Sequence, residues 1–227
     1  MATIQDKFEV YVRNFDMNDS MIRRKYEHTH GVARILADFE PHKISLALGY
    51  YHDLARFPQA EIYHTFDDSA SIDHAYHSAE ILEESEDFFL DGYTPEEKTI
   101  IIEAIRYHNK LTLPDTMTKE ERDWCDILRD ADMLENMQRL ETEYEDITGY
   151  SLEECQKQDI TPEVADCLRN HKLVDNRFVQ NGIDVFCRYI GFANGMTYIH
   201  PVKELGMICD KFTGDKREEL RVLAGLD

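Results

Sequence analysis

The chain has 227 residues and a formal net charge of −21, with 42% hydrophobic and 31% charged residues. This length and composition suit one large globular domain that buries a substantial core. The negative charge argues against duplex nucleic acid and anionic membranes as partners, because clustered Lys and Arg side chains bind phosphate groups. A small phosphorylated molecule or nucleotide stays open as a substrate, since a bound divalent metal reverses the sign of the local field.

Apolar runs and cysteines indicate the compartment. No apolar run approaches the length that spans a bilayer, and Met1 to Val10 lacks the apolar core of a signal peptide. The five cysteines are an odd number without a C-x-x-C pair, a pattern typical of free thiols in a reducing compartment. We therefore expect a cytoplasmic protein.

Helix signals recur along the chain and strand signals are scarce, so the sequence predicts an all-α fold. Residues 94–97 and 118–121 are typical of capping boxes, and Thr161-Pro162 of an N-cap followed by proline. The connection 57–71 is rich in Asp, Ser and aromatic residues, and we expect a long loop of the kind that often binds ligands. In chain order, the expected helices cover residues 3–14, 19–39, 43–56, 72–86, 95–109, 119–147, 161–168, 175–194, 200–212 and 214–224.

Four side chains on these helices have positions from which they can share a metal ion. His28 lies on the apolar face of its expected helix, and Asp132 borders the apolar face of another. His52 and Asp53 are adjacent near the end of an apolar helix, where both side chains can reach one ion from the same turn. Two imidazoles and two carboxylates form a mixed nitrogen and oxygen shell that suits Mn, Fe, Zn, Ni or Co.

Two further histidines have positions from which they can hold a second ion. His108 lies on the buried side of a helix end, and His74 begins the helix that follows the expected long loop. A single histidine in such a place is more often a satisfied or capping residue than a ligand. The spacing by itself leaves both interpretations open.

Three segments resemble, in chain order, the signatures of HD-domain metal-dependent phosphohydrolases: residues 26–33 (YEHTHGVA), 47–57 (ALGYYHDLARF) and 129–134 (RDADML). Residues 71–75 and 107–109 are similar to segments of a bacterial subgroup of that family. The resemblance spans about residues 20–136, and a weaker similarity continues from 182 to 192.

The resemblance implies an HD-domain-like helical bundle with additional C-terminal helices. We expect a single domain over residues 1–227, with a metal-site core at about 20–136 and a helical extension at about 150–227. A divalent metal is implied as cofactor, as one or two ions of Mn, Fe, Ni, Co, Zn or Mg. The implied primary ligands are His28, His52, Asp53 and Asp132, and those of a second ion are His74 and His108.

The chain departs from the family pattern at several positions. Ala55 replaces a common glycine, and Met133 stands where a lysine usually follows the final Ala-Asp, which removes a cation. Arg56-Phe57 stands where guanosine-tetraphosphate hydrolases have an acidic pair. The Gly-Tyr-Pro signature of one branch of cyclic-di-GMP phosphodiesterases is missing. These differences disfavour both of those branches.

The activity that the resemblance implies is hydrolysis of a phosphate ester or nucleotide by metal-activated water. Asp53 is the expected catalytic residue, which orients the nucleophile, and Arg56 and Lys110 are expected to bind the substrate phosphate. Two alternatives stay open: a metal-binding regulatory HD protein without turnover, which Met133 favours, and a di-iron oxygenase of HD-like fold, which uses similar ligands. Helical domains of this size often dimerise, so a homodimer also stays open.

Overall fold

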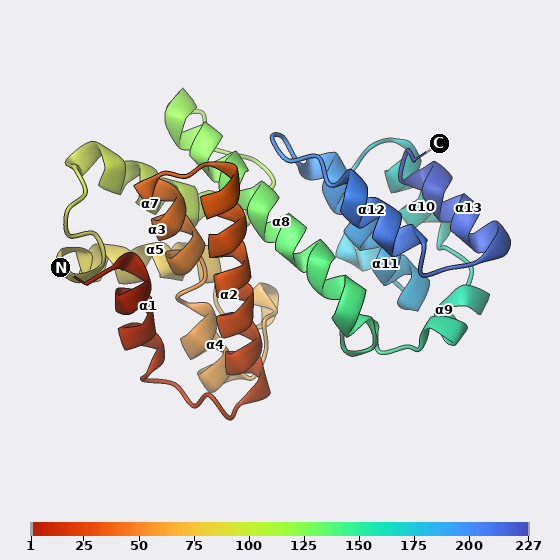
Figure 1. The fold of residues 1–227 in the computed structure, drawn as a ribbon, viewed down its shortest axis with the longest axis horizontal. Helices are drawn as coiled ribbons and strands as arrows, with labels where there is room; N and C mark the ends of the chain where they lie inside the picture. Colours follow the sequence, from red (N-terminus) through yellow and green to blue (C-terminus); the bar gives the residue numbers. More distant parts are fainter. Residues whose placement is uncertain (1, 227) are drawn as a thin grey trace. The chain divides into compact units, whose positions relative to one another are not determined.

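A computed structural model describes residues 2–226, and throughout this range the regular secondary structure is helical, without strands (Figure 1). The all-α class predicted from the sequence is confirmed. The chain divides into two compact units, one up to Ala131 and one from Asp132 onward. The boundary falls within a long helix, α8 (Lys119–Thr148). A single domain over residues 1–227 stays a prediction.

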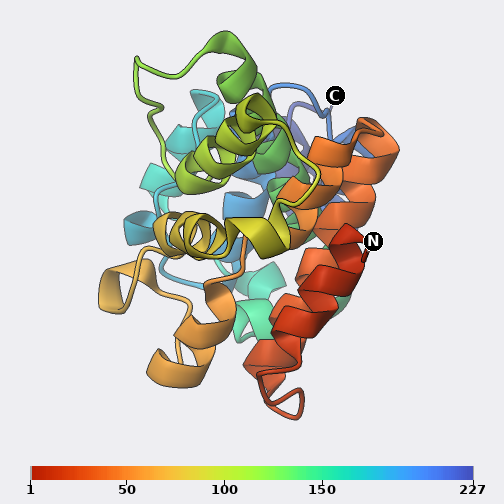
Figure 2. The ribbon, with the colours of Figure 1, turned by 90° about the vertical axis from the view of Figure 1, so that its left-hand side faces the viewer.

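The first unit is a bundle in which α2 packs along α3 and α4, α5 packs along α7, and α3 also contacts α1 and α7. Figures 1 and 2 show α2 lying beside α3 from two directions. The core includes Phe8 and Phe57, which are fully buried with their ring centroids 5.8 Å apart. The elements of this unit are α1 (Ile4–Val12), α2 (Ser20–Phe39), α3 (Lys43–Tyr51), α4 (Arg56–Tyr63), the 3-10 turn η1 (Asp68–Ala70), α5 (His74–Glu84), α6 (Glu86–Phe89), α7 (Pro95–Tyr107) and the first part of α8.

Side-chain caps begin several helices where the sequence predicts them. Thr94 and Glu97 exchange hydrogen bonds across the first turn of α7, with Pro95 at its first position, because both ends of a capping box lie within four residues. Thr118 and Glu121 form the same pair at α8.

The segment 57–71 is helical over its first half, so the prediction of a long loop there is wrong for residues 57–63. The predicted helix 43–56 ends at Tyr51, and a turn over 52–55 leads into α4. Phe57 and Ala60 form a buried face of α4, which stabilises the helix through packing. Pro58 is tolerated because the first-turn N–H groups of a helix have no intrahelical acceptor. The loop between α4 and α5 is therefore residues 64–73.

The second unit has a core of its own around Leu140, Phe186 and Leu220, all fully buried. Its helix α9 was not predicted, although Ser151 and Glu154 form a capping box. The elements of this unit are the remainder of α8, α9 (Leu152–Lys157), α10 (Pro162–Arg169), the 3-10 turn η2 (Asn176–Phe178), α11 (Gly182–Phe192), the 3-10 turn η3 (Ala193–Gly195), α12 (Val202–Cys209) and α13 (Gly214–Leu223).

A buried carboxylate organises the start of α10 and α11. Asp184 is fully buried, and its oxygens accept hydrogen bonds from the backbone and hydroxyl of Thr161 and from the backbone of Gln180. Thr161 is the N-cap residue of α10 with Pro162 in the first turn, as predicted, but its side chain donates to Asp184 and makes no capping hydrogen bond. The predicted helix 175–194 also begins late, at Gly182, where the Asn181 side chain caps α11.

Among residues 2–226, none of the helices combines the length and the apolar composition needed to cross a membrane.

Candidate metal centre

The predicted metal ligands of α2 and α3 are brought together by a close helix crossing. Gly49 of α3 lies against Ala33 of α2, so closely that a Cβ on Gly49 would stand 2.4 Å from the Ala33 Cα. Only glycine permits this approach. His28 lies just over one turn before Ala33, and His52 follows Gly49 by three residues, so the same crossing places their rings 5.5 Å apart.

The first candidate group contains His28, His52 and Asp132, whose ligand atoms lie within 4.8 Å of one another. His28 and His52 are buried, and Asp132 is half-buried. Asp132 follows Ala131 in the part of α8 that precedes a kink at Glu143. Its Oδ1 accepts a hydrogen bond of 3.0 Å from the Asn136 side chain, one turn later, which restrains the carboxylate.

The second candidate group contains Asp53, His74 and His108, all buried, again with ligand atoms within 4.8 Å of one another. The Nε2 atoms of His74 and His108 are 3.2 Å apart. Asp68, Asp73 and His74 form a third set with the same spacing, at the start of α5. The structure therefore brings together every residue that the family resemblance implies as a ligand, and it divides them into two groups.

Asp53 faces both groups. Its Oδ2 lies 3.5 Å from His52 Nε2 and 3.6 Å from His28 Nε2, while its Oδ1 lies 3.6 Å from His74 Nε2. Burial alone would raise the pKa of the Asp53 carboxyl, but the Lys25 ammonium and the nearby histidines hold this pKa well below its usual range. Asp53 is therefore an ionised carboxylate with one oxygen directed to each group.

The hydrogen bonds of three histidines determine which ring nitrogen faces the centre. His52 Nδ1 lies 3.0 Å from the Gly49 carbonyl, and His108 Nδ1 lies 2.7 Å from the Ile105 carbonyl. His74 Nδ1 lies 2.5 Å from the Asp68 carboxylate. These oxygens only accept hydrogen bonds, so each Nδ1 carries a proton and Nε2 is the ring nitrogen that faces the centre and could bind a metal. Metal-binding histidines are oriented in this way.

The arrangement of these nitrogens fits a bound cation. His74 Nε2 and His108 Nε2 lie 3.2 Å apart, close enough for both to bind one cation. Within residues 2–226, the buried His52 Nε2 has no hydrogen-bond partner, which is costly for a polar atom without a ligand. Imidazole nitrogen and carboxylate oxygen together suit divalent transition metals.

The predicted phosphate-binding residues, Arg56 and Lys110, lie beside the two candidate metal groups and form polar contacts with other residues. Arg56 Nη1 donates to Phe66 O at 2.7 Å and to Asp68 Oδ1 at 2.8 Å, and its Nη2 lies 3.4 Å from His74 Nε2. Lys110 forms an ion pair with Asp73 and is 38% exposed. Their binding of substrate phosphate stays a prediction.

Three residues of this region were missed in the sequence. Lys25 Nζ lies 2.8 Å from Asp53 Oδ2; its position three residues before His28, on the same helix face, was a signal for it. Gln59 and Asp68 lie in the segment that the sequence predicts as a loop, and a loop has no periodicity that reveals the direction of a side chain. Gln59 donates to Asp68 and to Ser71 of the loop 64–73.

One of three comparisons with known proteins found a match. The family model described as HD domain matches residues 26–137, a range that contains both groups. No curated protein and no solved structure matches the chain. HD domains are all-helical and bind divalent metals, and the two groups here contain histidine and aspartate side chains that could hold such ions. The matched segment, just under half of the chain, is therefore similar to an HD domain.

Proposed function

We propose that this protein is a metal-dependent phosphohydrolase that acts on a phosphate ester or nucleotide. The observation that carries the proposal is the pair of adjacent buried histidine and aspartate groups, with Asp53 directing one oxygen to each. A net charge of −21 makes an anionic substrate unfavourable, unless cations in the site reverse the local field. The site therefore depends on metal for substrate binding as well as for chemistry.

In this proposal, each group supplies the ligands of one metal ion. His28, His52 and Asp132 would hold one ion, and His74 with His108 would hold the other. Asp53 belongs to the second group and faces the first as well. Divalent metals in such sites make water nucleophilic near neutral pH and stabilise charge on phosphoryl oxygens.

The side chains around the groups have separate roles in this proposal. Asp53 is ionised at neutral pH, so its carboxylate can accept a hydrogen bond from water and orient it for attack on phosphorus. Lys25 holds the Asp53 carboxylate in place through its 2.8 Å contact. Lys25 and Arg56 both lie against the Phe66 ring, at 5.4 and 5.6 Å from its centroid, and they supply positive charge at this edge of the site for phosphate.

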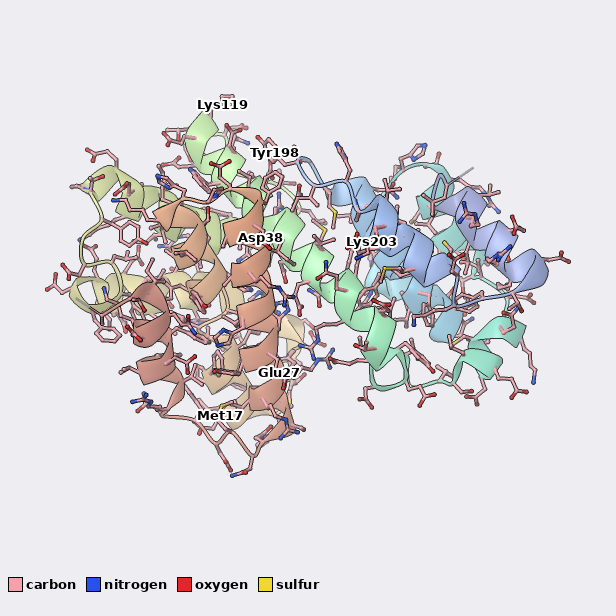
Figure 3. The ribbon with its side chains drawn as sticks, in the orientation of Figure 1. Met17, Glu27, Asp38, Lys119, Tyr198 and Lys203 are labelled. Atoms are coloured by element: carbon pink, nitrogen blue, oxygen red, sulfur yellow. The ribbon has the colours of Figure 1, made fainter. Side chains whose placement is uncertain are left out.

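The test compares three forms of the protein purified without chelator: the natural sequence, Asp53→Asn, and Asp38→Asn as a control. Asp53→Asn keeps the shape of the side chain and removes its charge. Asp38 is an exposed aspartate of α2 (Figure 3), so its variant removes one charge outside the site. Metal content is measured by mass spectrometry, and phosphate release is measured on nucleotides and small phosphate esters with Mn, Co, Ni and Mg.

We expect stoichiometric metal and phosphate release in the natural and Asp38→Asn proteins, and neither in Asp53→Asn. Stoichiometric redox-active iron without phosphate release would overturn the proposal in favour of a di-iron oxygenase. Bound metal without turnover of any phosphate ester would favour a regulatory protein, the alternative that Met133 supports. Full activity of Asp53→Asn would place the chemistry elsewhere.

A further inference from the structure

Gln59 is a fully buried polar side chain that belongs to neither metal group. Its Nε2 lies within hydrogen-bond distance of three acceptors in the following loop: Asp68 Oδ1 at 3.1 Å, Ser71 Oγ at 2.7 Å and Ile72 O at 3.2 Å. Its Oε1 accepts from Arg56 Nη1 at 2.7 Å. A buried amide with this set of partners has the loop 64–73 as its main contact, and it attaches that loop to α4.

Asp68 is the residue through which this loop reaches the metal centre. Its Oδ1 accepts from Arg56 at 2.8 Å and from Gln59 at 3.1 Å. Its Oδ2 accepts from Asn109 at 3.1 Å and lies 2.5 Å from His74 Nδ1. Four donors therefore surround one carboxylate, and they determine both its position and its orientation.

The loop is held in this position mainly by polar contacts of its side chains. Asp68 lies in η1, a three-residue turn without a buried residue, so apolar packing does not fix it. The side-chain hydrogen bonds of Gln59 and Arg56 replace that packing. Loss of these bonds would leave Asn109 and His74 as the remaining partners of Asp68 and would loosen its hold on His74 without exposing the core of the unit.

His74 differs in this respect from the other oriented histidines. His52 and His108 each contact a backbone carbonyl three residues earlier, Gly49 and Ile105, so their orientation needs no distant residue. His74 begins α5 and depends on Asp68, which the loop supplies. A change in the loop should therefore affect the group that contains His74 and leave the group of His28 and His52 intact.

We propose that Gln59 and Asp68 are positioning residues for the second metal ion: Gln59 holds Asp68, and Asp68 holds His74 so that its Nε2 faces Asp53 and His108. The inference rests on the proposed two-metal site and goes beyond it by assigning the occupancy of the second ion to the loop 64–73. Removal of such an outer hydrogen-bond partner typically lowers metal affinity about 10- to 100-fold.

The experiment titrates metal-free protein with Mn²⁺, by calorimetry and by electron paramagnetic resonance, which distinguishes an isolated ion from a coupled pair. We expect two ions and a coupled spectrum for the natural sequence. Asp68→Ala should weaken the second ion about 10- to 100-fold and remove the coupled spectrum, with the first ion unchanged. Asp68→Asn, which keeps an acceptor for His74 Nδ1, should recover part of this loss.

Gln59→Leu tests whether Gln59 holds Asp68 in place, since it keeps the buried volume and removes the hydrogen bonds. We expect the second ion to weaken about 3- to 10-fold, together with faster amide exchange in residues 65–72. Asp38→Asn is the matched control for loss of one carboxylate charge in the same unit, and it should titrate like the natural sequence.

Four results would overturn the inference. They are two tightly bound ions in Asp68→Ala, equal weakening of both ions in Asp68→Ala or Gln59→Leu, a full loss in Asp68→Asn, and a natural protein that binds one ion only. The titration does not depend on turnover. A second ion that Asp68→Ala loses, in a protein that hydrolyses no phosphate ester, would therefore support the positioning roles and refute the proposed activity.

Discussion

The close crossing of α2 and α3 makes Gly49→Ala a sharp test of how the metal centre is built. A Cβ at this position would stand 2.4 Å from the Ala33 Cα and 2.8 Å from the Ala33 Cβ. Ordinary van der Waals contact begins at 3.4 Å, so the two helices would have to separate by about 1 Å. The contacted atoms are backbone and a methyl group, which cannot rotate away.

The expected loss of stability follows from two opposed effects. Overpacking of this kind costs typically about 1–3 kcal/mol, and contact with a backbone atom places this case at the upper end. Alanine gains about 1 kcal/mol over glycine inside a helix, which leaves a net loss of about 2 kcal/mol. For a chain of this size, such a loss lowers the melting temperature by about 4–8 °C.

The same separation should also weaken metal binding, because it moves His52 away from His28. The ring centroids of these two residues are now 5.5 Å apart, and a displacement of about 1 Å exceeds the roughly 0.5 Å tolerance of a metal or catalytic site. Gly49→Ala should therefore weaken the ion bound by His28 and His52, as measured by Mn²⁺ titration.

Gly206→Ala is the matched control for this variant. Gly206 lies in α12, where an added Cβ would meet no atom of the described residues within 4 Å. This change should raise stability by up to about 1 kcal/mol without an effect on metal binding. Thermal melts by circular dichroism give both values. An unchanged melting temperature and unchanged metal affinity in Gly49→Ala would refute the close-crossing argument.

Three further predictions concern stability, pH and metal. Asp184→Ala should lower the free energy of unfolding by about 3 kcal/mol, because it leaves the Thr161 donors buried without their acceptor; a loss below 1 kcal/mol in urea denaturation would contradict this. Burial raises the pKa of Cys125 to about 12 and of Cys209 to about 11. The folded state therefore binds the thiol protons more tightly than the unfolded state, and this stabilises the folded state fully below the unfolded-state pKa. The stabilisation is lost as pH rises from about 9 toward the folded-state pKa values. Denaturation midpoints should therefore fall above pH 9, and at pH 8 a thiol reagent should modify the half-buried Cys167 before Cys125; rapid labelling of Cys125 in the folded protein would refute this. Mn²⁺ at 100 times its dissociation constant should raise the free energy of unfolding by about 2.7 kcal/mol, and EDTA should reverse the rise. A melting temperature that changes with neither addition would argue against a metal site in the folded state.

Local sequence signals predicted much of the fold because their causes are local. The capping box of Thr94 and Glu97 joins residues three apart, and it forms as predicted. The missed helix α4 shows the limit of this reasoning. The Asp, Ser and aromatic content of residues 57–71 predicts a loop, whereas burial of Phe57 and Ala60 makes the first part of the segment helical.

Non-local competition explains the errors at individual side chains. Thr161 has the sequence of an N-cap, yet its hydroxyl donates to Asp184, which lies 23 residues later in the chain. Gln59 and Asp68 lie near each other in sequence, but their relation to His74 depends on how the loop 64–73 folds back. No periodicity encodes such contacts.

The amino-acid sequence by itself determined the helical class and the set of side chains able to bind metal, because periodicity, caps and ordered motifs are properties of short segments. Only the tertiary structure decided how those side chains divide. The crossing at Gly49 and Ala33 joins His28 to His52, the turn between α3 and α4 gives Asp53 one oxygen for each group, and the loop 64–73 orients His74. These are distances between segments far apart in the chain, and they exist only once the helices have packed.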